Sequence, residues 1–406
     1  MPDIFWFRRD LRTFDNPALD AAGPDAVRMF VHDPHFAIVG SPRAQYLQEA
    51  LRPLGVVHVT GDPVAVLPAQ AATQGARRVF CTGDSTPYAA RRDEAVAEAL
   101  AQAGVELVMI DSPYAVPPGE VRNQSGAGFR VFTPFYKAWL ARGWAAPASA
   151  PDPTPAVKRW RQFRDEGLAA YKRDRDQPAL DATSRLSAAL HFGQLHPRTI
   201  LADIPEPTTD PFARQLAWRE FCADVLWHRP QAAWASLDER FDTDMEYSAD
   251  QAHFTAWQQG RTGYPFVDAG MRQLLAEGWM HNRLRMVTAS FLIKDLHLPW
   301  QWGAAWFMKH LVDGDVANNQ LGWQWVAGCG TDAAPYFRIF NPVTQGKKFD
   351  PDGTFIRRYV PELADVADPH EPGILAPDYP APIVDHGRER EVALARFQAL
   401  PPRTVR

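Results

Sequence analysis

The side chains best suited to chemistry lie close together in one segment, residues 313–345, which reads DGDVANNQLGWQWVAGCGTDAAPYFRIFNPVTQ. Asp313 and Asp315 stand one residue apart, an Asn pair follows, and Trp323 and Trp325 flank a glutamine. A Trp-rich helix packed in a large core would explain the indoles by themselves. The indoles are, however, combined with acids, amides and an Asn-Pro stretch that carries an arginine. This combination favours a functional site over simple packing.

Tryptophan is concentrated in one region of the chain. Indoles pack in cores, stack on nucleobases, and can be oxidised one electron at a time. Packing explains several of the indoles, but their density over about a quarter of the chain indicates a further use. Ten of the 14 tryptophans lie in this region: Trp218, Trp227, Trp234, Trp257, Trp279, Trp300, Trp302, Trp306, Trp323 and Trp325.

Length and composition restrict the class of protein. A chain of 406 residues predicts two domains, and 46% hydrophobic with 22% charged residues is a globular composition. No apolar run approaches the ~20 residues of a membrane span, and the N-terminus lacks the pattern of a secretory signal. We therefore expect a cytoplasmic protein. The three cysteines, Cys81, Cys222 and Cys329, predict buried thiols and neither a disulfide framework nor a metal cluster.

Net charge alone does not indicate a nucleic-acid partner, since the formal charge is −5. Basic residues nevertheless gather in 158–175 and 338–358, while acids gather in 238–250 and 362–378. Such runs are often only solvated faces. Beside stacking aromatic residues, however, they suit a surface that contacts phosphates with modest affinity.

Elements that could position these residues follow from periodicity. Short apolar runs alternate with helix-period segments through residues 1–111, which predicts βαβ units and a doubly wound parallel sheet. Neither a G-x-G-x-x-G after the first strand nor a Walker A motif is present, so the usual nucleotide cradles are absent. The expected strands are Ile4–Phe7, Val27–Val31, Val56–Thr60, Val79–Thr82 and Glu106–Ile110, with helices near 43–53, 63–74 and 89–103.

The remaining chain reads as helical. Residues 112–157 are rich in Pro, Gly, Ala and Ser apart from VFTPFYKAWL, and helical patterns dominate from about residue 158, followed by a Pro-rich, irregular tail after 361. The expected fold is thus an α/β doubly wound parallel-sheet N-terminal domain plus an all-α C-terminal domain. The predicted ranges are 1–125 for the α/β domain, 126–170 for an interdomain linker with one docked helix, and 171–406 for the helical domain.

Several long motifs resemble one family. The chain looks like a DNA photolyase of the photolyase/cryptochrome family and most resembles the class I cyclobutane pyrimidine dimer (CPD) enzymes. The resemblance runs nearly from end to end. It is carried by FWFRRDLRTFDNPAL (5–19), YKRDRDQPALDATSRLSAALHFGQLHPR (171–198), LAWREF (216–221), GRTGYPFVDAGMRQLLAEGWMHNRLRMVTASFLIKDL (260–296), DGDVANNQLGWQWVAGCGTDAAPYFRIFNP (313–342) and FNPVTQGKKFDPDGTFIRRYVPEL (340–363).

The resemblance implies a non-covalent, reduced FAD in the helical domain. On residues alone, Thr183 and Ser184 predict a helix N-cap, and Arg285 within apolar helical sequence needs an acidic partner, which we expect to be Asp313. The family adds a diphosphate cradle and an amide, Asn319, near the flavin N5, where it favours the fully reduced anionic ring. The implied FAD-binding residues are Tyr171, Thr183, Ser184, Arg185, Leu186, Ser187, Phe212, Arg219, Arg285, Asp313, Gly314, Asp315 and Asn319, with Phe212 expected to pack without an indole donor.

The resemblance also implies an electron relay and a lesion pocket. Trp323, Trp300 and, in place of a surface Trp, Tyr247 match the relay, with Trp302 or Trp306 as other exits. Trp218 and Trp325 match the indoles that enclose the flipped lesion, and Asn282 favours CPD because (6-4) enzymes carry a His there. Gln215 replaces the usual Glu and is found in (6-4) relatives. The implied catalytic residues are Trp323, Trp300, Tyr247, Asn319 and Gln215, and the lesion-binding or DNA-binding residues are Arg175, Gln215, Trp218, Asn282, Arg283, Met286, Trp325, Arg338 and Gln345.

The implied function is light-dependent repair of CPDs in UV-damaged DNA, by electron transfer from reduced FAD, in a monomeric carbon–carbon lyase. A cryptochrome-like photoreceptor and a (6-4) photolyase are the alternatives, and an ordinary flavin oxidoreductase would need a nicotinamide site. A second, antenna chromophore is expected in the N-terminal domain or at its interface. Tyr88 and Ala89 stand where folate-binding relatives carry an acid, so a deazaflavin or a flavin fits better than a folate.

Overall fold

A parallel sheet forms the first part of the chain in this computed structural model, which describes residues 2–36, 41–332 and 337–402. The strand order is β3-β2-β1-β4-β5, so the chain winds outward from β1 in one direction and then crosses to its other side. Ile4 pairs with both Val27 and Val79. The doubly wound parallel sheet is confirmed. Its strands are β1 Ile4–Phe7, β2 Val27–His32, β3 Val57–Thr60, β4 Arg78–Cys81 and β5 Glu106–Met109.

The chain divides by internal packing into two interleaved units. The first, called the sheet unit, comprises residues 1–169 and 184–230, and the second, called the helical unit, comprises residues 170–183 and 231–406. The predicted functional ranges 1–125, 126–170 and 171–406 stay a prediction.

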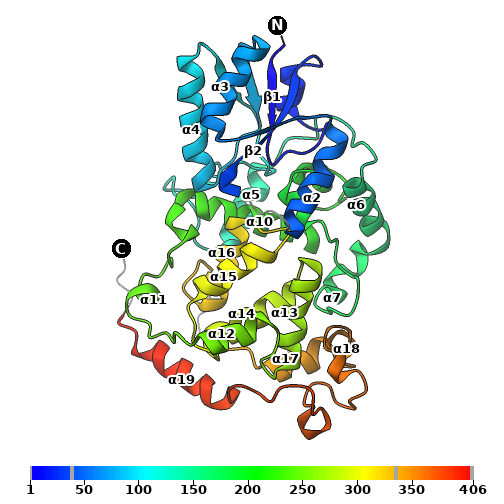
Figure 1. Ribbon diagram of the computed structural model, residues 1–406, viewed down its shortest axis with the longest axis vertical. Helices are drawn as coiled ribbons and strands as arrows, with labels where there is room; N and C mark the ends of the chain where they lie inside the picture. Colours follow the sequence, from blue (N-terminus) through cyan, green and yellow to red (C-terminus); the bar gives the residue numbers. More distant parts are fainter. Residues whose placement is uncertain (1, 37–40, 333–336, 403–406) are drawn as a thin grey trace. The chain divides into compact units, whose positions relative to one another are not determined.

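Helices of the sheet unit begin in a recurrent way. Asp62, Thr86, Thr154 and Asp210 each cap a helix N-terminus with their side-chain oxygen, and each precedes a proline at the first helical position. Helices α3 and α4 lie side by side (Figure 1). The predicted linker 126–170 holds α6 as well as the expected α5. The helices are α1 Pro17–Ala22, α2 Pro42–Leu51, α3 Pro63–Gln74, α4 Pro87–Gln102, α5 Phe132–Arg142, α6 Pro155–Glu166, α8 Ser187–His191, α9 Pro197–Ala202 and α10 Pro211–His228.

The helical unit surrounds one large apolar core, which includes Trp257, Trp300 and Trp323. Its described residues contain no strand, so the all-α prediction is confirmed. Nowhere in the described part of the chain is a helix both long enough and apolar enough to cross a bilayer. The helices are α7 Tyr171–Asp174, α11 Arg240–Thr243, α12 Gln251–Gln258, α13 Pro265–Glu277, α14 Asn282–Lys294, α15 Trp300–His310, α16 Val316–Ala327, α17 Pro342–Phe349, α18 Thr354–Tyr359 and α19 His386–Ala399.

The prediction of an irregular tail after residue 361 is wrong, because α19 is a 14-residue helix. The Asp385 side chain accepts a hydrogen bond from the Arg388 N–H and so starts the helix. Its first residue, His386, contacts the Asp295 carboxylate through Nδ1, and near its end Phe397 stacks on Phe337 with ring centroids 4.3 Å apart. The prolines before residue 383 hid this helix in the sequence.

Glu220 fixes α10 in the sheet unit. One carboxylate oxygen accepts the Ala115 N–H at 2.6 Å, and the other accepts the Val116 N–H at 3.1 Å and the Trp139 indole N–H at 2.6 Å. Burial raises the pKa of Glu220 to about 7, although these hydrogen bonds favour the charged form.

We expect Glu220→Gln to change how stability depends on pH. Between pH 4.5, the ordinary pKa of a glutamate, and pH 7 the folded protein holds a proton at Glu220 that the unfolded chain releases, so this group's contribution to stability falls as pH rises. The stability advantage of the parent over the variant should shrink from pH 5 to pH 8, by up to about 3 kcal/mol. Urea unfolding at both pH values measures this. Glu120→Gln, which alters an exposed carboxylate paired with Arg142, is the control, and an equal advantage at both pH values would contradict the prediction.

Candidate active site

One stripe of α16 carries three of the predicted residues. Asp315 caps the helix by accepting the Asn318 N–H at 2.9 Å, and Asn319 and Trp323 follow at intervals of four residues, so they share that face. The Asn319 amide donates to the Ala304 carbonyl at 3.0 Å and to the Gln320 side chain at 2.7 Å. Asn319 is thereby held in one orientation on a buried surface.

An ion pair joins α14 to the turn before α16. The Arg285 guanidinium donates to both carboxylate oxygens of Asp313, at 3.1 and 2.8 Å, and its Nε donates to the Met280 carbonyl at 2.8 Å. The Asp313 side chain is 2% exposed, whereas that of Arg285 is 26% exposed. The predicted pairing is confirmed. Gly314 lies between Asp313 and Asp315, in the same turn.

Trp323 is packed between α15 and its own helix. A Cβ at Gly303 would lie 2.1 Å from the Trp323 ring, so only glycine permits this approach. The ring also meets Phe307 and Trp257 edge-on, with centroids 5.0 and 6.1 Å away. Its indole N–H is buried without a hydrogen-bond acceptor among the described residues. The sequence assigned no role to Trp257, since nothing in its surroundings set it apart from other core indoles.

The other predicted relay residues occupy different surroundings in the same unit. Trp300 begins α15, and its indole N–H donates to the Ser236 hydroxyl at 2.9 Å. The Tyr247 hydroxyl is buried and lacks a hydrogen-bond partner within the described ranges. Burial, with the nearby Cys329 and Asp242, raises the pKa of Tyr247 well above its ordinary value. Deprotonation of the Tyr247 phenol is therefore unfavourable in the folded protein.

The predicted lesion residues of the helical unit are spread over several elements. Asn282 and Met286 lie one turn apart on α14, with the amide nitrogen 3.7 Å from the Met286 sulfur. Arg283 pairs with Asp176 at 3.0 Å and lies over the Phe349 ring, so much of its side chain is enclosed. Among the other members of this set, Arg175 lies over the buried Tyr171 ring, Trp325 is partly buried against the core, and Gln345 is on α17.

Arg338 is exposed on a segment anchored to α14. The buried Lys294 ammonium donates to the Arg338 carbonyl and lies 4.3 Å from the centroid of Phe337, and the Ser290 hydroxyl accepts the Phe340 N–H. Burial lowers the pKa of Lys294 to about 7. These contacts fix the backbone on which Arg338 stands. Residues 333–336 of the motif lie outside the described residues.

The structure of residues 183–187, which are predicted to bind a diphosphate, contradicts the expected helix N-cap. Thr183 and Ser184 do not cap a helix, because α8 starts only at Ser187, after Leu186. Ser184 instead accepts the Leu186 N–H in a turn, and Arg185 adopts the left-handed backbone conformation, with φ of 55°. A residue with a side chain rarely adopts this conformation, and such strain is typical of functional loops.

Helix α10 carries the remaining predicted residues, all in the sheet unit. Phe212 packs against Trp160 and Phe163, and its packing against a cofactor stays a prediction. Trp218 stacks on Phe132 with centroids 3.8 Å apart, and Gln215 lies one turn before it. Arg219 donates to the Pro113 and Leu190 carbonyls, each at 3.2 Å.

The helical unit therefore brings five predicted residues into one connected set, Arg285, Asp313, Asp315, Asn319 and Trp323. They offer a guanidinium, carboxylates and an amide as donors and acceptors beside a buried indole nitrogen without a partner in the described part. This donor set fits the hydrogen-bonding edge of a flavin ring. The binding roles of all the predicted site residues stay predictions.

Comparisons with known proteins identify the family. The family described as DNA photolyase matches residues 3–157, and the one described as FAD binding domain of DNA photolyase matches residues 212–399. A deoxyribodipyrimidine photo-lyase of Halobacterium salinarum is 38% identical, over 97% of this chain and 98% of that protein. A class III photolyase of Agrobacterium tumefaciens has a TM-score of 0.90 at 34% identity, over 98% of this chain and 97% of that one. An archaeal photolyase of Sulfolobus tokodaii with two FAD molecules has a TM-score of 0.81 at 30% identity, over 98% and 100%.

The chain belongs to the DNA photolyase family. It is an enzyme of the carbon–carbon lyase type that acts in DNA repair, and its cofactor is FAD. The Agrobacterium protein is a class III enzyme, so the expected closeness to class I stays a prediction.

We expect Gly303→Ala to disturb the Trp323 site, because the added methyl group would overlap the indole. Overpacking of this kind costs about 1–3 kcal/mol. Gly322→Ala is the matched control: it also adds a methyl group in a helix of this unit, but nothing lies within 4 Å of the new Cβ. This control should be stabilised by about 0.5–1 kcal/mol. Urea unfolding followed by tryptophan fluorescence measures both, and equal stability of the two variants would refute the packing argument.

Proposed function

We propose that this enzyme splits cyclobutane pyrimidine dimers in UV-damaged DNA, using light and reduced FAD. The observation that carries this proposal is the α16 stripe, on which Asn319 and Trp323 follow the Asp315 cap beside the Arg285–Asp313 pair. An amide at the position of Asn319 offers no acidic proton, which suits a flavin kept fully reduced. The reaction returns its electron, so it needs no dissociable cosubstrate.

The residues of the stripe and of the Arg285–Asp313 pair each have a defined task in this proposal. Bound FAD supplies the electron after it absorbs light. Arg285 and Asp313 would hold the polar edge of the ring, Asp315 would accept a hydrogen bond from it, and Asn319 would present an oriented amide. Because the Asn319 amide already donates to the Ala304 carbonyl, it needs no reorganisation when the cofactor binds.

The lesion residues provide shape and hydrogen bonds. Trp218 and Trp325 give apolar walls for a puckered dimer, and Asn282 hydrogen-bonds it. Gln215 reads the pyrimidine edge by accepting from N3–H and donating to the C4 carbonyl. Gln215 also favours the competing function, (6-4) repair, because relatives with that activity carry glutamine there. Arg175, Arg283, Arg338 and Gln345 contact phosphates and the lesion rim.

The electron relay and the antenna complete the proposal. Trp323 and Trp300 pass an electron inward, with Tyr247 or another exit at the end. A flavin is the favoured second chromophore, since the similar Sulfolobus structure contains two FAD molecules. We further propose a monomer that acts in the cytoplasm.

We expect Arg285→Gln to lower FAD affinity by at least about tenfold, because it leaves the buried Asp313 carboxylate without the charged Arg285 Nη2 group that donates to both of its oxygens. Bound flavin per protein, measured by absorbance after dialysis, reports this. Arg272→Gln is the control, since Arg272 is about as exposed as Arg285 and pairs with Glu362 elsewhere in the helical unit. Equal flavin loss in both variants would indicate general destabilisation and contradict the assigned role.

A repair assay tests which lesion is the substrate. Reduced holoenzyme is irradiated with oligonucleotides that carry one CPD or one (6-4) lesion, and we expect restoration of the CPD only. Trp325→Ala should retain FAD but bind the CPD strand about tenfold more weakly, because a stacking wall is lost. The same samples kept in the dark are the control. Repair of only the (6-4) lesion, or of neither lesion, would overturn the proposed function.

A further inference from the structure

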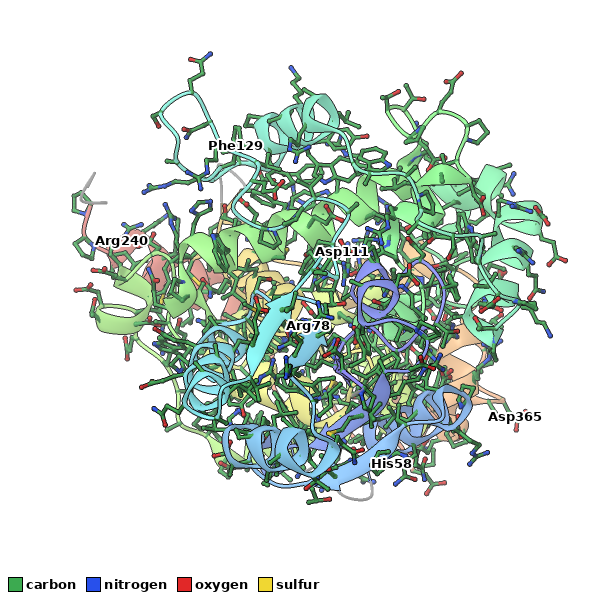
Figure 2. The ribbon with its side chains drawn as sticks, turned by 90° about the horizontal axis from the view of Figure 1, so that it is seen from above. His58, Arg78, Asp111, Phe129, Arg240 and Asp365 are labelled. Atoms are coloured by element: carbon green, nitrogen blue, oxygen red, sulfur yellow. The ribbon has the colours of Figure 1, made fainter. Side chains whose placement is uncertain are left out.

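A pocket of about 460 Å³ lies in the sheet unit, and none of its lining residues is among the site residues assigned above. It is formed by the loop 123–131 and the C-terminal end of α10. Figure 2 labels Phe129 on this loop. The loop approaches α10 closely, since a Cβ at Gly128 would lie 2.3 Å from the His228 ring. The size falls within the ~300–1,000 Å³ of small-molecule sites.

The lining is positively charged. Among the residues that the structure describes, those around the pocket include Arg130, Arg229 and His228 but no carboxylate. Burial and the charge of Arg130 lower the pKa of Arg229. The nearby Asp224 lies 3.9 Å from His228, and its Oδ1 already accepts the Gly119 N–H. Two guanidinium groups on one concave surface favour a phosphate, which they bind in a planar, bidentate manner.

Apart from Asn123, the rest of the lining is apolar. Phe129, Val131 and Val225 line the same pocket, and Val131 is exposed. A ligand that satisfies both parts combines an anionic phosphate with a flat, weakly polar ring. A nucleotide has this chemistry, because its base stacks on an aromatic ring while its phosphate meets arginine.

Helix α10 connects this pocket to Trp218. Val225 follows Trp218 by seven residues, a spacing that returns to the same face of a helix, and Arg229, eleven residues after Trp218, caps the C-terminal end of α10. Eleven residues span about 16 Å along the axis. That length corresponds to roughly five base pairs of duplex DNA. Arg214, one turn before Trp218 on this face, lies over the Phe132 ring.

We propose that this pocket binds a nucleotide phosphate, contributed by the DNA strand that flanks the lesion. The proposal rests on the proposed function for the role of Trp218. It adds a phosphate contact in the sheet unit, whereas the residues predicted above to contact phosphates lie in the helical unit. A free mononucleotide has the same chemistry, so the test separates the two sources.

Binding of FAD-loaded enzyme to labelled duplexes tests the proposal. The duplexes carry one CPD with about four or about twelve flanking base pairs, and the parent is compared with Arg229→Gln by fluorescence anisotropy at several salt concentrations. We expect Arg229→Gln to bind the long duplex about three- to tenfold more weakly, with a salt slope reduced by about one, and to bind the short duplex normally. Arg229→Lys should retain part of the affinity.

Arg142→Gln is the matched control, because it removes the same charge at the far end of α5 and should leave both affinities unchanged. Calorimetry with dAMP distinguishes the source: if Arg229→Gln loses only dAMP binding, the pocket takes a free nucleotide. Parent-like binding by Arg229→Gln to both duplexes and to dAMP overturns the proposal, as does equal weakening on both duplex lengths. Binding of an undamaged long duplex and of dAMP reports on the pocket even if the parent repairs no CPD. A failure of the pocket proposal can therefore be distinguished from a failure of the proposed repair function.

Discussion

The close packing of Trp323 against Gly303 sets the geometry on which the helical unit's site depends. A backbone without a Cβ lets α15 approach the indole directly, and this approach fixes the rotation of α16 about its axis. Once that rotation is fixed, Asn319 must lie one turn away on the same face, where it meets the Ala304 carbonyl of α15. The polar groups of the site are thus positioned by an apolar contact, which is less sensitive to salt and pH than an ion pair would be.

Three of the buried charged groups among the described residues are compensated in different ways. Asp313 has an arginine as its ion-pair partner, Glu220 has three hydrogen-bond donors, and Lys294 has a backbone carbonyl and an aromatic face. Hydrogen bonds from neutral groups offset less of the desolvation cost than an opposite charge does, so Glu220 and Lys294 have displaced pKa values near 7. Proteins keep such groups where they fix a backbone segment, and here they fix the segments around Ala115 and Arg338.

The sequence was sufficient to predict the parallel sheet, because its strands are short apolar runs that alternate with helices along the chain. It was also sufficient for the Arg285–Asp313 pair, since a buried guanidinium must find an acid. It failed for Ser184, where local turn geometry with a left-handed Arg185 outweighed the usual capping preference. It missed α19, because proline content concealed a helix whose start depends on one capping carboxylate. The burial of the Tyr247 hydroxyl and the pocket at Arg229 depend on residues distant in sequence, which no local pattern encodes.

The docking of α19 supports the segment that carries Arg338. Phe397 supports the ring of Phe337 from the outside, while Lys294 contacts the same ring, so the residue before Arg338 is gripped by two separate elements. Changes in the length or composition of α19 would therefore shift the backbone that carries Arg338. With Arg338 in its proposed contact to DNA, such changes would alter how firmly the enzyme holds a damaged strand while leaving the proposed cofactor-binding residues unchanged.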